Sequence, residues 1–327
     1  MRLKLVPETT SVNFFRHGKT GFMASLLMMV AAVIVWVSIG LNFGIDFRGG
    51  TTIRTESSTP VDVGAYRAAI TPLGLGEVAI TEVFDPASAL AEPDRYVTMI
   101  RLEAQEGDES VAAETVSRVR AALTELDPSI RFAAVESVGP KVSGELIIAA
   151  IIAVALAIFA VLVYIWLRFE WQFALGAVAA LVHDVVLTIG VFSILQIRFD
   201  LAIIAALLTI VGYSLNDTVV VFDRVRENLR KYKKTELRDV LNLSINETLS
   251  RTVMTSLTTL IALICLFVLG GDVIRGFVFA MIWGVIIGTY SSIWVASNLL
   301  LRLGLKRDWS DDAPGGGAGT QFGDAQA

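Results

Sequence analysis

The sequence has 327 residues, of which 54% are hydrophobic and only 18% are charged, and its formal net charge is −5. This composition excludes an ordinary soluble domain, because apolar runs of about 18 residues or more are typical of membrane spans. With one cysteine and two histidines, it also excludes an internal disulfide and a His/Cys metal cage. Six runs are long enough to span a membrane: Gly21–Leu41, Leu146–Leu167, Phe173–Leu195, Leu201–Phe222, Val253–Leu269 and Gly276–Leu301.

Residues 1–20 form a polar leader, and the first transmembrane helix is predicted over residues 21–41. This helix is not a cleavable signal peptide, because it is long, follows a polar leader and lacks a small-x-small exit. The stretch His17-Gly18-Lys19-Thr20 resembles the end of a phosphate-binding loop, but Asn13 stands where the leading glycine is needed and no strand precedes it. The sequence therefore does not encode ATP hydrolysis.

Residues 42–145 are long enough to bury a small core and are predicted to form an external domain. The pattern is strand, helix, strand, strand, helix, strand, which matches a ferredoxin-like split βαβ unit. The segment carries 9 basic and 17 acidic residues, so it would repel nucleic-acid phosphates. The predicted strands are Thr51–Thr55, Val78–Phe84, Tyr96–Leu102 and Arg131–Val138, and the predicted helices are Pro60–Ile70 and Ser110–Leu126.

Residues 146–301 are predicted to form five further transmembrane helices, with a cytoplasmic segment at 223–252, and residues 302–327 form a tail. Basic residues gather in the leader, in the 223–252 segment and after the last span, so these regions and both termini are predicted to be cytoplasmic. Pro314–Ala327 is rich in Gly and Ala and is predicted to be disordered. The predicted fold class is an α-helical membrane protein with six transmembrane helices and a small α+β ferredoxin-like periplasmic domain.

A carboxylate lies deep in the fourth span, at Asp217. A charged group at the centre of a span costs about 2.5–3.5 kcal/mol, so such residues are functional candidates. Helical spacing predicts that Gly212, Tyr213 and Asn216 share a face with Asp217 and that this face points into the bundle.

Arg251 begins the fifth span, and a polar stripe of Thr255, Thr258 and Thr259 follows it at helical spacing. A carboxylate beside a guanidinium holds a proton less readily than a separated one, so an Asp217–Arg251 pair whose separation changes is a workable proton switch. The alternative is a fixed structural pair, or an Arg251 that orients its helix at the membrane surface.

The third span carries His183 and Asp184, with Thr188 one turn beyond Asp184. Neighbouring positions on a helix point about 100° apart, so the two cannot both face one partner. Proton relay and helix packing through hydrogen bonds remain alternatives for this pair. In the last span, Gly284 and Gly288 form a Gly-x-x-x-Gly pair, which is typical of close helix contacts.

Several long motifs resemble one known family. The segment after the first span, which contains Asp46, Phe47, Gly49 and Gly50, resembles the signature of the SecD/SecF family of protein-export membrane proteins. The other motifs resemble the SecF branch of that family: Val138–Val142, His183–Val185, Gly212–Arg224 and Asn246–Thr252.

This resemblance implies a protein-export subunit of the resistance-nodulation-division superfamily, multi-pass in the bacterial inner membrane and without enzymatic activity or cofactor. It implies that Asp217 carries protons from the proton motive force, with Arg251 as its partner. It further implies association with SecD, with the SecYEG channel, with SecA and YajC through the same assembly, and with translocating preproteins and membrane lipid. The small external domain leaves substrate capture to SecD.

Two other classes use similar features. A lipid or drug efflux transporter shares the architecture, although a small external domain without a large apolar cleft argues against it. An intramembrane aspartyl protease would use Asp184 and Asp217, but its two carboxylates must share a proton, and a nearby arginine opposes that.

Overall fold

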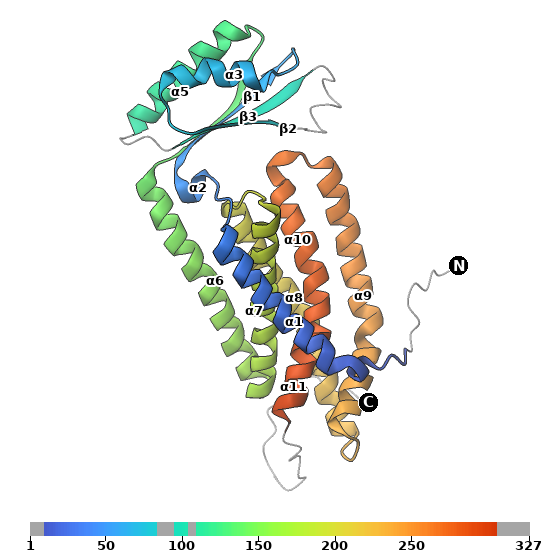
Figure 1. Ribbon diagram of the computed structural model, residues 1–327. Helices are drawn as coiled ribbons and strands as arrows, with labels where there is room; N and C mark the ends of the chain where they lie inside the picture. The colour runs from blue at the N-terminus through green and yellow to red at the C-terminus, as the bar shows by residue number, and fades with distance from the viewer. Residues whose placement is uncertain (1–9, 84–94, 104–108, 306–327) are drawn as a thin grey trace, which may run out of the picture.

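The computed structural model describes residues 10–83, 95–103 and 109–305, which form a membrane bundle with a small α+β domain at one end (Figure 1). Within these ranges, six helices are long and apolar enough to cross a membrane, as predicted. The first five are α1 (Gly18–Ile39), α6 (Pro140–Arg168), α7 (Trp171–Leu195), α8 (Leu201–Lys231) and α9 (Leu237–Leu269). The sixth comprises α10 (Asp272–Ser291), a π-helical turn (Ser292–Ala296) and α11 (Ser297–Leu303).

The helices extend beyond the predicted spans. Helix α6 begins at Pro140 rather than at Leu146, because proline at the first helical position loses no hydrogen bond there. The segment predicted at 223–252 is mostly helical, since it consists of the end of α8 and the start of α9. The predicted disorder of the tail concerns residues outside the described ranges.

The α+β domain, which the sequence predicts to be external, contains one antiparallel sheet in the order β2-β3-β1-β4. Helices α3 (Val63–Ile70) and α5 (Glu109–Leu126) cover the face of the sheet that points away from the membrane bundle (Figure 1). The element order agrees with the predicted split βαβ unit. The strands are β1 (Gly50–Ser57), β2 (Val78–Val83), β3 (Tyr96–Leu102) and β4 (Arg131–Val138).

The core of this domain lies between the sheet and its two helices. Ile53 of β1 and Ile100 of β3 are fully buried against Val119 and Leu123 of α5. Asp62 caps α3 by accepting hydrogen bonds from the N–H groups of the second and third helical residues, which is why the helix begins after it and not at the predicted Pro60.

Small residues bring the membrane helices into close contact. A Cβ added to Gly284 of α10 would overlap Ile210 of α8, and one added to Gly288 would lie 3.0 Å from the Cβ of Ser214. The predicted Gly-x-x-x-Gly contact is therefore confirmed. A third glycine, Gly190 of α7, meets Ala32 of α1 in the same way.

We expect Gly190→Ala to lower the thermal stability of the purified subunit, because its new methyl group would collide with the Cβ and the backbone of Ala32 and push α1 away from α7. The matched control is Gly144→Ala in α6, where an added Cβ meets no atom within 4 Å. A melting temperature that falls equally in both variants would contradict the close packing of α1 on α7.

Candidate proton-transfer site

The predicted functional carboxylate lies inside the bundle. Asp217 of α8 is only 3% exposed, and no described residue forms a hydrogen bond with its Oδ2. Helix α8 packs against α7, α9 and α10, so the side chain is enclosed by neighbouring helices. Because an unpaired carboxylate is costly to bury, this oxygen is a natural place for a proton to bind.

Arg251 lies on the adjacent helix α9 and is exposed on this chain. It is near enough to interact electrostatically with Asp217, but no ion pair within 4.0 Å joins these two described side chains. Arg251 instead lines a polar cavity of about 520 Å³, whose wall on α8 runs from Val219 to Glu227. The cavity thus begins within one helical turn of Asp217. Arg251, the predicted partner of Asp217 in the proton switch, is one of the residues that line it.

The prediction that Gly212, Asn216 and Asp217 lie on one face of α8 that points into the bundle is partly wrong. Gly212 and Asn216 are exposed, whereas Asp217 is buried. Asn216 and Asp217 are consecutive and point about 100° apart, so only one of them can face the helices that cover α8. Tyr213 is intermediate, and its hydroxyl lies 3.4 Å from Thr259 Oγ1 of α9, in the predicted threonine stripe.

The threonines of this stripe are satisfied within their own helix. Thr255 Oγ1 donates to the carbonyl oxygen of Arg251, and Thr259 Oγ1 donates to that of Thr255. With Gly212 and Asn216, the partly exposed stripe forms a polar face on α8 and α9 that the described part of the chain leaves uncovered.

Asp184 of α7 lies at the centre of a buried hydrogen-bond network. Its Oδ2 accepts hydrogen bonds from Ser214 Oγ of α8 (2.6 Å) and Ser291 Oγ of α10 (2.8 Å). Its Oδ1 lies 2.9 Å from His183 Nδ1. These hydrogen bonds join α7, α8 and α10, so Asp184 contributes to the packing of the three helices. Proton relay through His183 and Asp184 remains a prediction.

The sequence predicted that His183 and Asp184 could not both face one partner, but both contact α10, at Tyr290 and Ser291. His183 also lies against the carboxylate of Asp184. It is fully buried and stacks on Tyr290, with 6.0 Å between the ring centroids. Its Nε2 has no hydrogen-bond partner among the described residues. Ser214 and Ser291 were missed in the sequence, because an isolated serine in a span carries no signal of its long-range partner.

The segment that resembles the family signature joins the external domain to α8. Asp46 Oδ2 accepts a hydrogen bond from the N–H of Leu201, the first residue of α8, at 2.9 Å. Asp46 lies in the short helix α2 (Ile45–Arg48), and β1 follows directly. Gly49 and Gly50 make this junction with φ values of 74° and 123°, which other residues rarely adopt.

An aromatic cluster reinforces the same junction. Phe47 is buried against Phe43 and Phe199, with ring centroids 5.8 and 6.0 Å away. The N–H of Gly44 also donates to the carbonyl oxygen of Phe199 at 2.8 Å. The turn before α8 is therefore held firmly to the base of the external domain.

Six helices long and apolar enough to cross a membrane, a small split βαβ domain and a buried carboxylate define a multi-pass membrane protein. Residues 118–306 match the model of the protein export membrane protein SecD/SecF C-terminal region, and residues 34–61 match that of the SecD/SecF GG motif. The chain belongs to the SecD/SecF family.

Its relatives include protein translocase subunits SecF. The one from Cereibacter sphaeroides is 60% identical over 326 residues and covers 100% of this chain and 99% of its own. A fused SecDF of Brucella abortus is 39% identical, with 39% of its length covered. The crystal structure of SecDF from Thermus thermophilus matches with a TM-score of 0.76 at 35% identity, covering 91% of this chain and 39% of that one.

Proposed function

We propose that this chain is a SecF-type subunit of the bacterial protein translocase and helps polypeptides cross the inner membrane by using the proton motive force. The buried carboxylate of Asp217, whose Oδ2 has no hydrogen-bond partner among the described residues, carries this proposal. It sits in the helix whose first residue is tied by Asp46 to the external domain, so one rigid element connects a proton site with the outer surface. The subunit acts in transport, and it is neither an enzyme nor dependent on a cofactor.

SecD is the proposed partner within the membrane. The fused relative supports this pairing, since its remaining length provides room for a second half. The uncovered polar face of α8 and α9, with Asn216 and Arg251, is where SecD helices would pack. Through SecD the chain would associate with the SecYEG channel, SecA and YajC, with both termini in the cytoplasm.

In the proposed mechanism, a proton enters from outside and neutralises Asp217. This removes its attraction to Arg251, so α8 repacks against the SecD helices and the proton leaves through the polar cavity that Arg251 lines. The Asp46 contact passes the movement of α8 to the external domain, which then hinders backsliding of the substrate. One charge crossing 100 mV supplies about 2.3 kcal/mol, which is enough to shift such an equilibrium.

The contacts of Asp184 disfavour the protease alternative. Its oxygens interact with His183, Ser214 and Ser291, and none of these contacts involves Asp217. A catalytic pair of aspartates requires the two carboxyl groups to share one proton.

Complementation tests the proposed function against efflux. In cells depleted of their own SecF, we expect this chain, expressed with its SecD, to prevent the accumulation of unprocessed secretory precursors. Extrusion of dyes and lipids should not change. Restored extrusion with precursors still accumulated would instead assign the chain to efflux.

We expect Asp46→Ala to reduce gradient-dependent export several-fold, because the loss of a helix cap frees the start of α8 from the signature segment. The matched control is Asp62→Ala, which removes the cap of α3 at a comparable cost of about 1 kcal/mol but lies away from the membrane junction. Export rates would be compared in membrane vesicles with and without an imposed proton gradient. Equal losses in both variants would contradict a coupling role for Asp46.

A further inference from the structure

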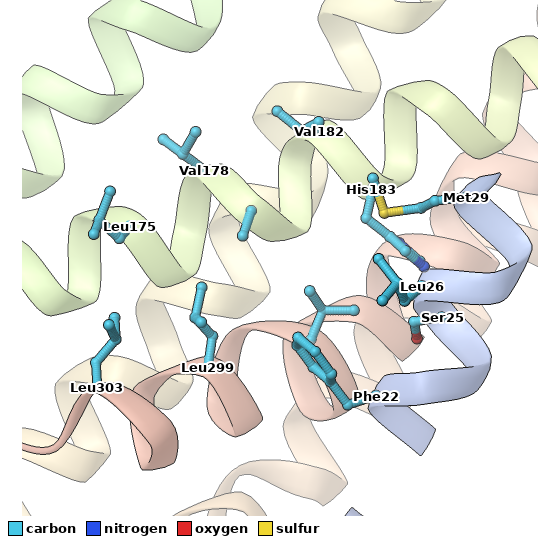
Figure 2. A pocket seen from close by; sticks show the side chains of 12 residues that line it. Phe22, Ser25, Leu26, Met29, Leu175, Val178, Val182, His183, Leu299 and Leu303 are labelled. Atoms are coloured by element: carbon cyan, nitrogen blue, oxygen red, sulfur yellow. The ribbon is translucent and has the colours of Figure 1, made fainter. Parts of the chain in front are cut away.

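An apolar pocket of about 400 Å³ opens between α1, α7 and α11, separate from the Asp217 site (Figure 2). Side chains from all three helices point into it, and most of them are hydrocarbon. Its main lining residues are Phe22, Leu26, Met29, Leu175, Val178 and Leu299.

We propose that this pocket binds one acyl chain of an anionic phospholipid from the cytoplasmic leaflet. This inference does not depend on the translocation proposal. The pocket runs along α7 from Leu175 near the cytoplasmic end to His183, and these eight helical steps span about 12 Å. One leaflet of a hydrocarbon core about 30 Å thick has a similar depth, so the bilayer offers a lipid tail at this place.

A basic residue stands where the headgroup would lie. The guanidinium of Arg302 lies 4.0 Å from the ring centroid of Phe22, which lines the pocket. Arg302 is exposed in the last turn of α11, next to the lining residue Leu303. Arginine remains protonated and binds phosphate oxygens through paired N–H groups, so its position complements a lipid phosphate.

His183 forms the deep end of the pocket. Its Nε2 is buried and has no hydrogen-bond partner among the described residues, so it discourages an apolar tail from penetrating further. On its other side, the ring contacts Asp184, whose hydrogen bonds join α7, α8 and α10. A bound tail would therefore fill space beside the network that holds the bundle together.

The size of the pocket favours a lipid tail over a protein segment. A helix with its side chains is about 10–12 Å wide, and a 12 Å length of such a cylinder greatly exceeds 400 Å³. A single hydrocarbon chain is far thinner and leaves its headgroup free to reach Arg302.

Photolabelling of the full chain tests the site. The protein would be reconstituted in vesicles of phosphatidylethanolamine and phosphatidylglycerol with a trace of phosphatidylglycerol that carries a diazirine in one tail. Peptide mass spectrometry should find several-fold more label at Leu26 and Val178 than at Leu156, a lipid-facing residue of α6. Equal labelling at these positions would overturn the proposal.

Two variants narrow the pocket, and a third alters its mouth. Ala179→Phe and Leu175→Trp should each reduce the label at Val178 several-fold, whereas Ala160→Phe on the exposed face of α6 should not. Leu175 is 42% exposed at the mouth, so its variant is expected to fold even if the first does not. Arg302→Gln should remove the preference for the phosphatidylglycerol probe over a phosphatidylcholine probe with the same tail. Unchanged labelling in both filled variants, or its loss when SecD is added, would reject a lipid site.

Discussion

Replacing Asp217 by Asn is expected to abolish the gradient-dependent part of polypeptide export while the subunit remains assembled. Asparagine has nearly the same shape as aspartate but cannot exchange a proton. Because no described residue forms a hydrogen bond with Asp217 Oδ2, the substitution breaks no such bond at that atom. The rate would be measured in inverted membrane vesicles that contain SecYEG, SecD and this chain, with SecA and ATP in excess. The variant should export at the same rate with and without an imposed proton gradient.

The matched control is Asp239→Asn, which neutralises an exposed carboxylate in the first turn of α9. It should keep the wild-type response to the gradient. An Asp217→Asn variant that retains this response would show that Asp217 is a structural residue and would return attention to Asp184.

A second large effect is expected from Asp184→Ala. This change removes the acceptor of Ser214 Oγ inside the bundle and the shorter of two hydrogen bonds of Ser291 Oγ, which keeps its 3.2 Å contact with the carbonyl oxygen of Gly288. Each buried unsatisfied donor costs about 1–3 kcal/mol, so the variant should unfold at a lower temperature and assemble poorly. Thermal unfolding in detergent and size-exclusion chromatography would measure both effects.

Asp184→Asn separates the two alternatives for this residue. The amide oxygen still accepts a hydrogen bond, so we expect much of the stability and gradient-driven export to return. An Asn variant that assembles normally but ignores the gradient would contradict a packing role and identify Asp184 as a proton relay.

The membrane architecture could be predicted because each span is a local property. Six apolar runs identify six helices without any knowledge of their neighbours, and the alternation of Thr51–Thr55 identifies a strand in the same way. The helix ends were less accurate, since hydropathy marks the hydrocarbon core and not the polar turns beyond it. Helices α8 and α9 therefore extend well into the predicted cytoplasmic segment.

The arrangement of the site could be predicted only in part, because it depends on which faces meet. The cost of burying a carboxylate identified Asp217, but the sequence did not reveal that Asn216 and Gly212 stay uncovered. The family resemblance identified Asp46 as a signature residue. Only the folded structure shows that Asp46 lies beside the N–H of Leu201, which is separated from it by 155 positions in the sequence. The serines around Asp184 likewise follow from the packing of α7, α8 and α10.

Infrared difference spectroscopy would test proton exchange at Asp217 most directly. Spectra of the chain with SecD in membranes, recorded as the pH is lowered, should show the carbonyl stretch of a carboxyl group becoming protonated in a buried environment. We expect this band to be absent from Asp217→Asn and retained in Asp239→Asn. An unchanged band in the Asp217→Asn variant would contradict proton exchange at this residue.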